Sequence, residues 1–126
     1  MNQKVDDAVL EAEHPLILAS RVEKTPVFDR AGNRMGHIDD LSIQKASGQV
    51  IYAIMSFGGF LGIGEKFHPV PWSLLDYVAG YGGYVVPLDR SALEKAPRYD
   101  AAELRELGGA REALLSYYSP YGAGPY

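Results

Sequence analysis

The sequence contains no cysteine, and its 12 basic residues are outnumbered by 16 acidic ones, which gives a formal net charge of −4. Without cysteine the chain has no disulfides, no thiolate metal ligands and no cysteine nucleophile, a composition that fits a cytoplasmic protein. Proteins that bind nucleic acid generically carry a basic patch or stripe, which the acidic balance here argues against. We therefore expect a cytoplasmic protein that does not have nucleic acid as a partner.

Long hydrophobic segments are also lacking. The first 15 residues carry four acidic side chains and lack the apolar segment of a signal peptide. The uncharged run from Ala46 to Gly64 holds five glycines, whereas a bilayer-spanning helix needs about 20 predominantly apolar residues. We interpret this run as a strand followed by a loop, and we expect no transmembrane segment.

Nucleotide-binding motifs are incomplete. The spacing Gly59-x-x-x-x-Gly64 approaches a phosphate-binding loop, which requires Gly-Lys-[Ser/Thr] at its end. In this chain Glu65 precedes Lys66, and Phe67 stands where the hydroxyl residue belongs. The dinucleotide motif fails as well, because its third glycine and the surrounding βαβ unit are missing. We expect no nucleotide cofactor.

Catalytic and metal-binding patterns are equally incomplete. Neighbouring strand residues point to opposite faces, so Asp39 and Asp40 share a site only if a β-bulge turns them together. We favour a solvated bulge in which one carboxylate accepts backbone N–H bonds. Neither Ser56 nor Ser73 lies in a G-x-S-x-G motif. The histidines fit no zinc-ligand spacing: His14, His37 and His68. We expect no catalytic residue, no metal and no cofactor, and hence a protein that is not an enzyme.

The 126 residues, 47% of them hydrophobic, suffice for one domain with its own core. Apolar alternation punctuated by Gly and Pro predicts a mainly β protein. We expect a first strand over 16–24 and 26–28, a turn at Gly32 and Asn33, and one helical turn at 72–75. The remaining strands are expected at 35–44, 50–57, 65–70, 77–79 and 84–88.

The alternation breaks within the second of these strands. Ile38 and Asp40 share one parity, while Leu41 and Ile43 share the other. A β-bulge near residues 39 and 40 would bring Ile38, Leu41 and Ile43 to the core face.

The segment 50–57 is apolar on both faces, with Ile51, Ala53 and Met55 opposite Tyr52 and Ile54. A strand buried on both faces needs a cover, which the C-terminal helices or a second subunit could supply. Exposed apolar patches mark interfaces, and homodimers are the commonest closed oligomers. We predict a homodimer that uses the outer face of this strand, the loop around residues 60 and 61, or both. The alternative is a monomer in which residues 101–118 cover the strand.

Helical signals begin only near the C-terminus. Ser91-x-x-Glu94 and Asp100-x-x-Glu103 have the spacing of capping boxes. We expect a flexible acidic leader over residues 1–15, a barrel domain over 16–99, a helical extension over 100–118 and a mobile Tyr/Gly/Pro tail over 119–126.

A glycine-rich segment carries a family resemblance. It reads GQVIYAIMSFGGFLGIGEK over residues 48–66, is followed by Val70-Pro71-Trp72, and has VFDRAGNRMGHIDDL upstream at 27–41. Together these segments resemble the PRC-barrel domain family. That family includes the cytoplasmic domain of the photosynthetic reaction-centre H subunit, the C-terminal domain of a ribosome-maturation factor and many stand-alone bacterial proteins. The resemblance implies a small PRC-type β-barrel of about five to six antiparallel strands with short C-terminal helices.

The resemblance implies no catalytic site. We expect a non-catalytic binding or scaffold module, of the stand-alone bacterial kind, that mediates self-association or contact with an unidentified protein partner. One alternative is an adaptor in RNA processing or ribosome assembly, and another is a reaction-centre H-subunit-like role in photosynthetic electron or proton transfer. The H subunit carries a membrane helix ahead of its barrel, which we do not expect here.

Two groups of residues are candidates for a partner surface. One surrounds the glycine-rich loop, and the other is a run of tyrosines, a residue type enriched at interfaces. The candidates are Phe60, Leu61, Glu65, Lys66, His68, Tyr117, Tyr118 and Tyr121. The alternative for the tyrosines is that Tyr117 and Tyr118 pack on the barrel.

Overall fold

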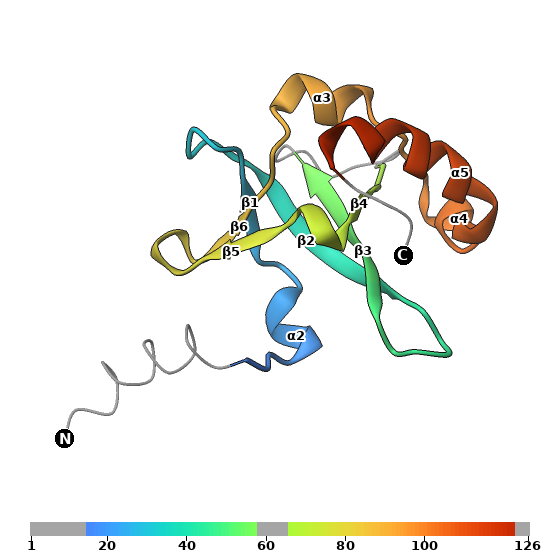
Figure 1. Cartoon of the computed structure of the whole chain (residues 1–126), viewed down its shortest axis with the longest axis horizontal. Helices are drawn as coiled ribbons and strands as arrows, with labels where there is room; N and C mark the ends of the chain where they lie inside the picture. The colour runs from blue at the N-terminus through green and yellow to red at the C-terminus, as the bar shows by residue number, and fades with distance from the viewer. Residues whose placement is uncertain (1–14, 58–65, 123–126) are drawn as a thin grey trace.

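A computed structural model of the chain describes residues 15–57 and 66–122. Six strands form one sheet, and the C-terminal helices lie together on one side of it (Figure 1). The strands are β1 (Pro26–Phe28), β2 (Arg34–Ile43), β3 (Val50–Phe57), β4 (His68–Pro71), β5 (Asp76–Val78) and β6 (Gly83–Val85). The main helices are α2 (Ala19–Val22), α3 (Arg90–Lys95), α4 (Ala101–Leu104) and α5 (Leu107–Tyr118). Single 3-10 turns are η1 (Trp72–Leu74), η2 (Ala79–Tyr81) and η3 (Ser119–Tyr121).

The strand order is β4-β3-β2-β1-β6-β5. Neighbours are antiparallel except for β1 and β6, which are parallel, so the expectation of an entirely antiparallel sheet is wrong at that pair. Within residues 15–57 and 66–122, β4 and β5 pair on one side only, and the sheet is not closed. A mainly β fold of six strands with short C-terminal helices is confirmed.

The segment before β1 differs from the prediction. Residues 16–24 do not form a strand; they contain the single turn of α2, from which Val22 reaches the core at 2% exposure. Lys24 has a positive φ of 68° and redirects the chain into β1. The apolar run Leu16–Leu18 suggested a strand, but periodicity cannot distinguish helix from strand over so few residues.

The predicted bulge in β2 is present. The pairing of β2 with β3 shifts between Ile38 and Asp40, which leaves Asp39 as the extra residue and Ile38 fully buried. Leu41 packs against the core, as expected. Ile43 does not: a second shift between Ser42 and Ile43 turns its side chain outward, to 51% exposure.

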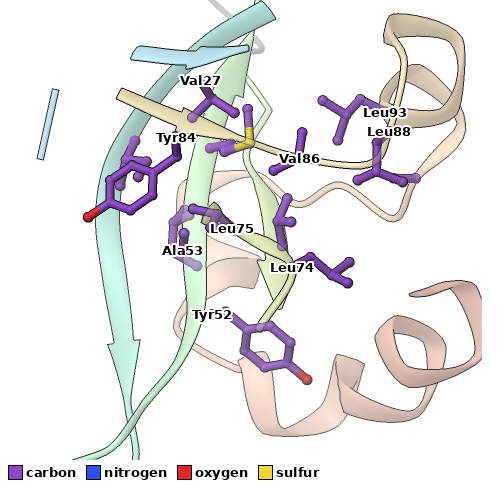
Figure 2. Close-up of a cluster of buried hydrophobic side chains, with 14 of the residues drawn as sticks. Val27, Tyr52, Ala53, Leu74, Leu75, Tyr84, Val86, Leu88 and Leu93 are labelled. Atoms are coloured by element: carbon purple, nitrogen blue, oxygen red, sulfur yellow. The ribbon is translucent and has the colours of Figure 1, made fainter. Parts of the chain in front are cut away.

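The core is continuous from the concave face of the sheet to the helices. Ala53, Val27 and Tyr84 belong to the cluster drawn in Figure 2, together with Val86 and Leu75. The cluster extends to Leu88, just before α3, and to the helical residues Leu93 and Leu114.

Two of the helices, α3 and α4, begin at side-chain caps. Asp100 and Glu103 form the predicted capping box of α4. For α3 the cap is Asp89, which accepts from the Ala92 N–H, and not Ser91 as predicted; the helix starts two residues earlier than that pattern required. None of the helices in the described part of the chain is long and apolar enough to cross a bilayer.

Gly83 lies where β6 and β1 approach each other closely. A Cβ atom at this position would lie 2.2 Å from the Pro26 carbonyl oxygen and 3.1 Å from Cε2 of Phe28. The backbone oxygen cannot move away without breaking the parallel pairing of β1 and β6. Gly80, in the adjacent η2 turn, has no heavy atom within 4 Å of the same test position.

We predict that Gly83→Ala destabilises the protein by about 2 kcal/mol or more, the cost of overpacking. Gly80→Ala serves as the matched control and should leave the stability unchanged within about 0.5 kcal/mol. Urea unfolding of the three proteins measures both values. Equal stability of the two variants would contradict the close approach of β6 to β1.

Candidate binding groove

A groove of about 520 Å³ lies between the outer face of the sheet and α4. We call it the β3–α4 groove. Its floor is apolar, with Ile54 from β3, Phe67 from the segment before β4 and Leu104 from α4. The polar lining residues are Asp39, Asp40, Ser42 and Arg105.

The β2 bulge places both carboxylates along this groove. Asp40 is exposed, and its Oδ1 accepts the Leu41 N–H at 2.8 Å, the predicted use of one carboxylate in the bulge. Asp39 is half-buried, and its two oxygens are engaged by His37 Nε2 at 3.0 Å and by the Ser56 hydroxyl, which donates to Oδ2. The extra residue therefore turns two adjacent carboxylates toward one groove, which regular alternation would separate.

The hydrogen bonds that join His37, Asp39 and Ser56 have a structural role. Asp39 stands between the imidazole and the hydroxyl. Ser56 is 3% exposed, so a substrate cannot reach its hydroxyl. Within residues 15–57 and 66–122, no group of three or more His, Cys, Asp or Glu side chains could hold a metal ion.

A short bridge holds the helical side of the groove against the sheet. Phe67 and Tyr99 exchange two backbone hydrogen bonds, of 2.8 and 2.9 Å, just before α4 begins. At the same end, Lys66 Nζ lies 3.9 Å from Glu103 Oε1, with both side chains substantially exposed. Lys66 is therefore the one residue of the predicted loop surface that the structure describes and leaves exposed; Phe60, Leu61 and Glu65 lie outside the described residues.

His68 is not on the surface, contrary to the prediction for an edge strand. It is 3% exposed, and all four residues of β4 are buried. Burial and the nearby positive charge of Arg98 lower the pKa of His68 to about 4, while a hydrogen bond to the Pro97 backbone acts in the opposite direction. The prediction failed because a distant segment, which contains Pro97 and Arg98, lies against His68.

The three tyrosines of the predicted surface differ in how deeply they are buried. Tyr118 is fully buried, and burial raises the pKa of its hydroxyl. Tyr117 is half-buried and donates its hydroxyl hydrogen to the Ala92 carbonyl. Tyr121, in η3, remains 37% exposed. The alternative in which Tyr117 and Tyr118 pack within the domain is therefore the one that the structure shows.

The outer face of β3 is covered within one chain. Tyr52 and Ile54 are each 3% exposed. Leu115 of α5 lies beside Tyr52, and Leu104 of α4 beside Ile54; Figure 2 shows the Tyr52 ring on the side of the C-terminal helices. The outer face of β3 is thus unavailable as the interface of the predicted homodimer.

Comparison with known proteins gives a family match and a similar solved structure. A profile of the PRC-barrel domain family matches residues 14–93. No curated protein matches the chain. Among solved structures, the chain is similar to a Pseudomonas aeruginosa protein described as the 16S ribosomal RNA processing protein RimM, with 18% identity and a TM-score of 0.40. The match covers 64% of this chain and 48% of the other, so the chain spans about half of that protein's length.

The burial of His68 predicts a specific loss of stability in acid. The unfolded state takes up a proton below the ordinary histidine pKa of 6.5, whereas the folded state resists protonation down to about pH 4. The free energy of unfolding should therefore fall between pH 6.5 and 4, by up to about 3 kcal/mol from this group. His68→Gln should flatten this part of the profile, whatever its effect at neutral pH.

Urea unfolding measured at half-unit steps between pH 7 and 4 tests this expectation. The control is His37→Gln, which retains His68 and should retain its contribution to the fall. Parallel profiles for wild type and His68→Gln would contradict a buried neutral imidazole.

Proposed function

The chain belongs to the PRC-barrel domain family, and from this premise we propose that it is a non-catalytic binding module whose β3–α4 groove receives a segment of a partner protein. The observation that carries the proposal is the combination of an apolar floor with charged groups of both signs in the lining of one groove. Family membership supports a domain without catalysis, and the groove supplies a place for a partner.

The size of the groove supports a short bound segment. Its volume of about 520 Å³ lies within the range of about 300–1,000 Å³ common to ligand sites. The floor side chains Phe67 and Leu104 are each only partly buried, so they can lose further solvent contact on binding. Burial of that remaining apolar surface would favour association by about 25 cal/mol per Å² before the costs of ordering.

The charges in the groove define the kind of segment. Two carboxylates, Asp39 and Asp40, stand against one guanidinium, Arg105. Since Asp39 already has two hydrogen-bond partners, the exposed Asp40 is the group best able to meet a cation. We therefore expect the partner segment to carry apolar side chains beside a lysine or arginine.

Selection from a library of random short peptides displayed on phage tests this function. The purified chain should enrich peptides that combine apolar residues with Lys or Arg. Asp40→Lys and Leu104→Asp should each weaken the selected peptides at least tenfold in calorimetry, a factor worth about 1.4 kcal/mol. The matched control is Ile17→Asp, which alters an exposed apolar residue outside the groove.

Two outcomes would overturn the proposal. One is the absence of any enriched peptide family, and the other is binding that survives both groove substitutions. Co-sedimentation with ribosomal subunits tests the alternative of an adaptor in ribosome assembly. Ribosome binding that is indifferent to Asp40→Lys and Leu104→Asp would place the function outside this groove.

A further inference from the structure

The two edge strands of the sheet, β4 and β5, differ in how well they are protected from pairing with another chain. At one edge, β4 is buried at all four positions. Two of those positions, Pro69 and Pro71, have no N–H to offer, and the Phe67–Tyr99 bridge occupies the adjoining backbone. These are ordinary devices by which proteins prevent an edge strand from pairing with another chain.

Among the residues that the structure describes, none protects the other edge in a comparable way. β5 pairs only with β6, and among residues 15–57 and 66–122 no backbone hydrogen bond reaches β5 from its outer side. Asp76 and Tyr77 are exposed, Tyr77 at 44%. The strand has no proline, no lysine and no bulge in its pairing with β6. A single acidic side chain, Asp76, is the only charge on it.

Aromatic side chains surround this edge. Tyr77 lies opposite Tyr84 in the antiparallel pair, so both rings are on the same face of the sheet, with centroids 5.3 Å apart. Tyr84 is buried in the core, whereas Tyr77 extends the aromatic cluster to the open edge. Tyr81, in the adjoining η2 turn, is 45% exposed, and its ring packs on that of Phe28 with the centroids 5.0 Å apart.

We propose that β5 is the docking site for a second copy of this chain, whose own β5 adds in antiparallel orientation to join the two sheets. The sequence of the strand is self-complementary in this arrangement. With Tyr77 opposite its own copy, Asp76 meets Val78 of the second chain, and no like charges face each other. Directly opposed like charges destabilise antiparallel pairs, whereas paired aromatic residues stabilise them by about 0.2–1 kcal/mol.

The strand contributes only three residues from each copy. Stable interfaces bury about 1,200–2,000 Å² in total, more than such an edge supplies without the flanking tyrosines. The dimer is therefore reversible and depends on protein concentration. This surface is separate from the β3–α4 groove, and it replaces the outer face of β3 as the interface of the predicted homodimer.

Disulfide trapping tests the register. The natural chain has no cysteine, so Tyr77→Cys introduces the only thiol. Directly opposed residues have Cα atoms about 4.5–5.5 Å apart, within the range of about 4.4–6.8 Å that a disulfide spans. Mild oxidation of this variant should give a covalent dimer that dithiothreitol reverses. Tyr121→Cys, at a comparably exposed tyrosine, is the control and should remain monomeric.

Sedimentation velocity over a range of concentrations tests the dimer itself. The average mass of the wild type should rise with concentration, and Tyr77→Lys, which brings two lysines face to face, should weaken association at least tenfold. Tyr121→Lys and the groove variant Leu104→Asp should associate as the wild type does. Circular dichroism confirms that each variant is folded.

A wild-type mass that stays monomeric at every concentration would overturn the proposal. So would equal trapping of Tyr77→Cys and Tyr121→Cys, or no trapping of Tyr77→Cys. If Tyr77→Lys does not fold, the trapping experiment alone decides the outcome. Because Leu104→Asp separates peptide binding from association, a failure of the dimer and a failure of the groove are distinguishable.

Discussion

The packing of the C-terminal helices on the outer face of β3 is the contact on which the rest of the structure depends. β3 is buried on both faces, with Ala53 and Met55 in the concave core and Tyr52 and Ile54 beneath the helices. An open sheet of six short strands could not bury both faces by itself. The helices thus act as a second layer of the domain, and the β3–α4 groove exists because that layer meets the sheet incompletely at the bulge in β2.

The parts of the fold that sequence reasoning anticipated are those decided by local chemistry. The bounds of β3, the bulge at Asp39 and the cap at Asp100 each follow from side chains within a few residues. The errors occur where a distant segment decides the environment. His68 has the sequence context of an edge strand, and its burial depends on the chain around Pro97 and Arg98.

The residues of the candidate site divide in the same way, into those that local sequence indicates and those that a distant segment contributes. The two carboxylates were visible in the sequence, and a bulge was identified as the condition for bringing them together. Leu104 and Arg105, which complete the β3–α4 groove, lie more than 60 residues away in the chain. No periodicity connects such distant residues, so the groove became visible only through the tertiary structure. Tyr118 is a different case: its residue type suggested an interface, but its side chain is buried in the core.

The cover over β3 also has a consequence for synthesis. A ribosome makes the chain from its N-terminus, and Ile54 emerges before Leu104 and Leu115, the residues that cover the outer face. At about 5–20 residues per second, the roughly 50 residues that separate Ile54 from Leu104 take several seconds to make. During that interval the nascent strand can be buried on its concave side alone. The apolar outer face of β3 therefore stays uncovered during synthesis until α4 and α5 have been made.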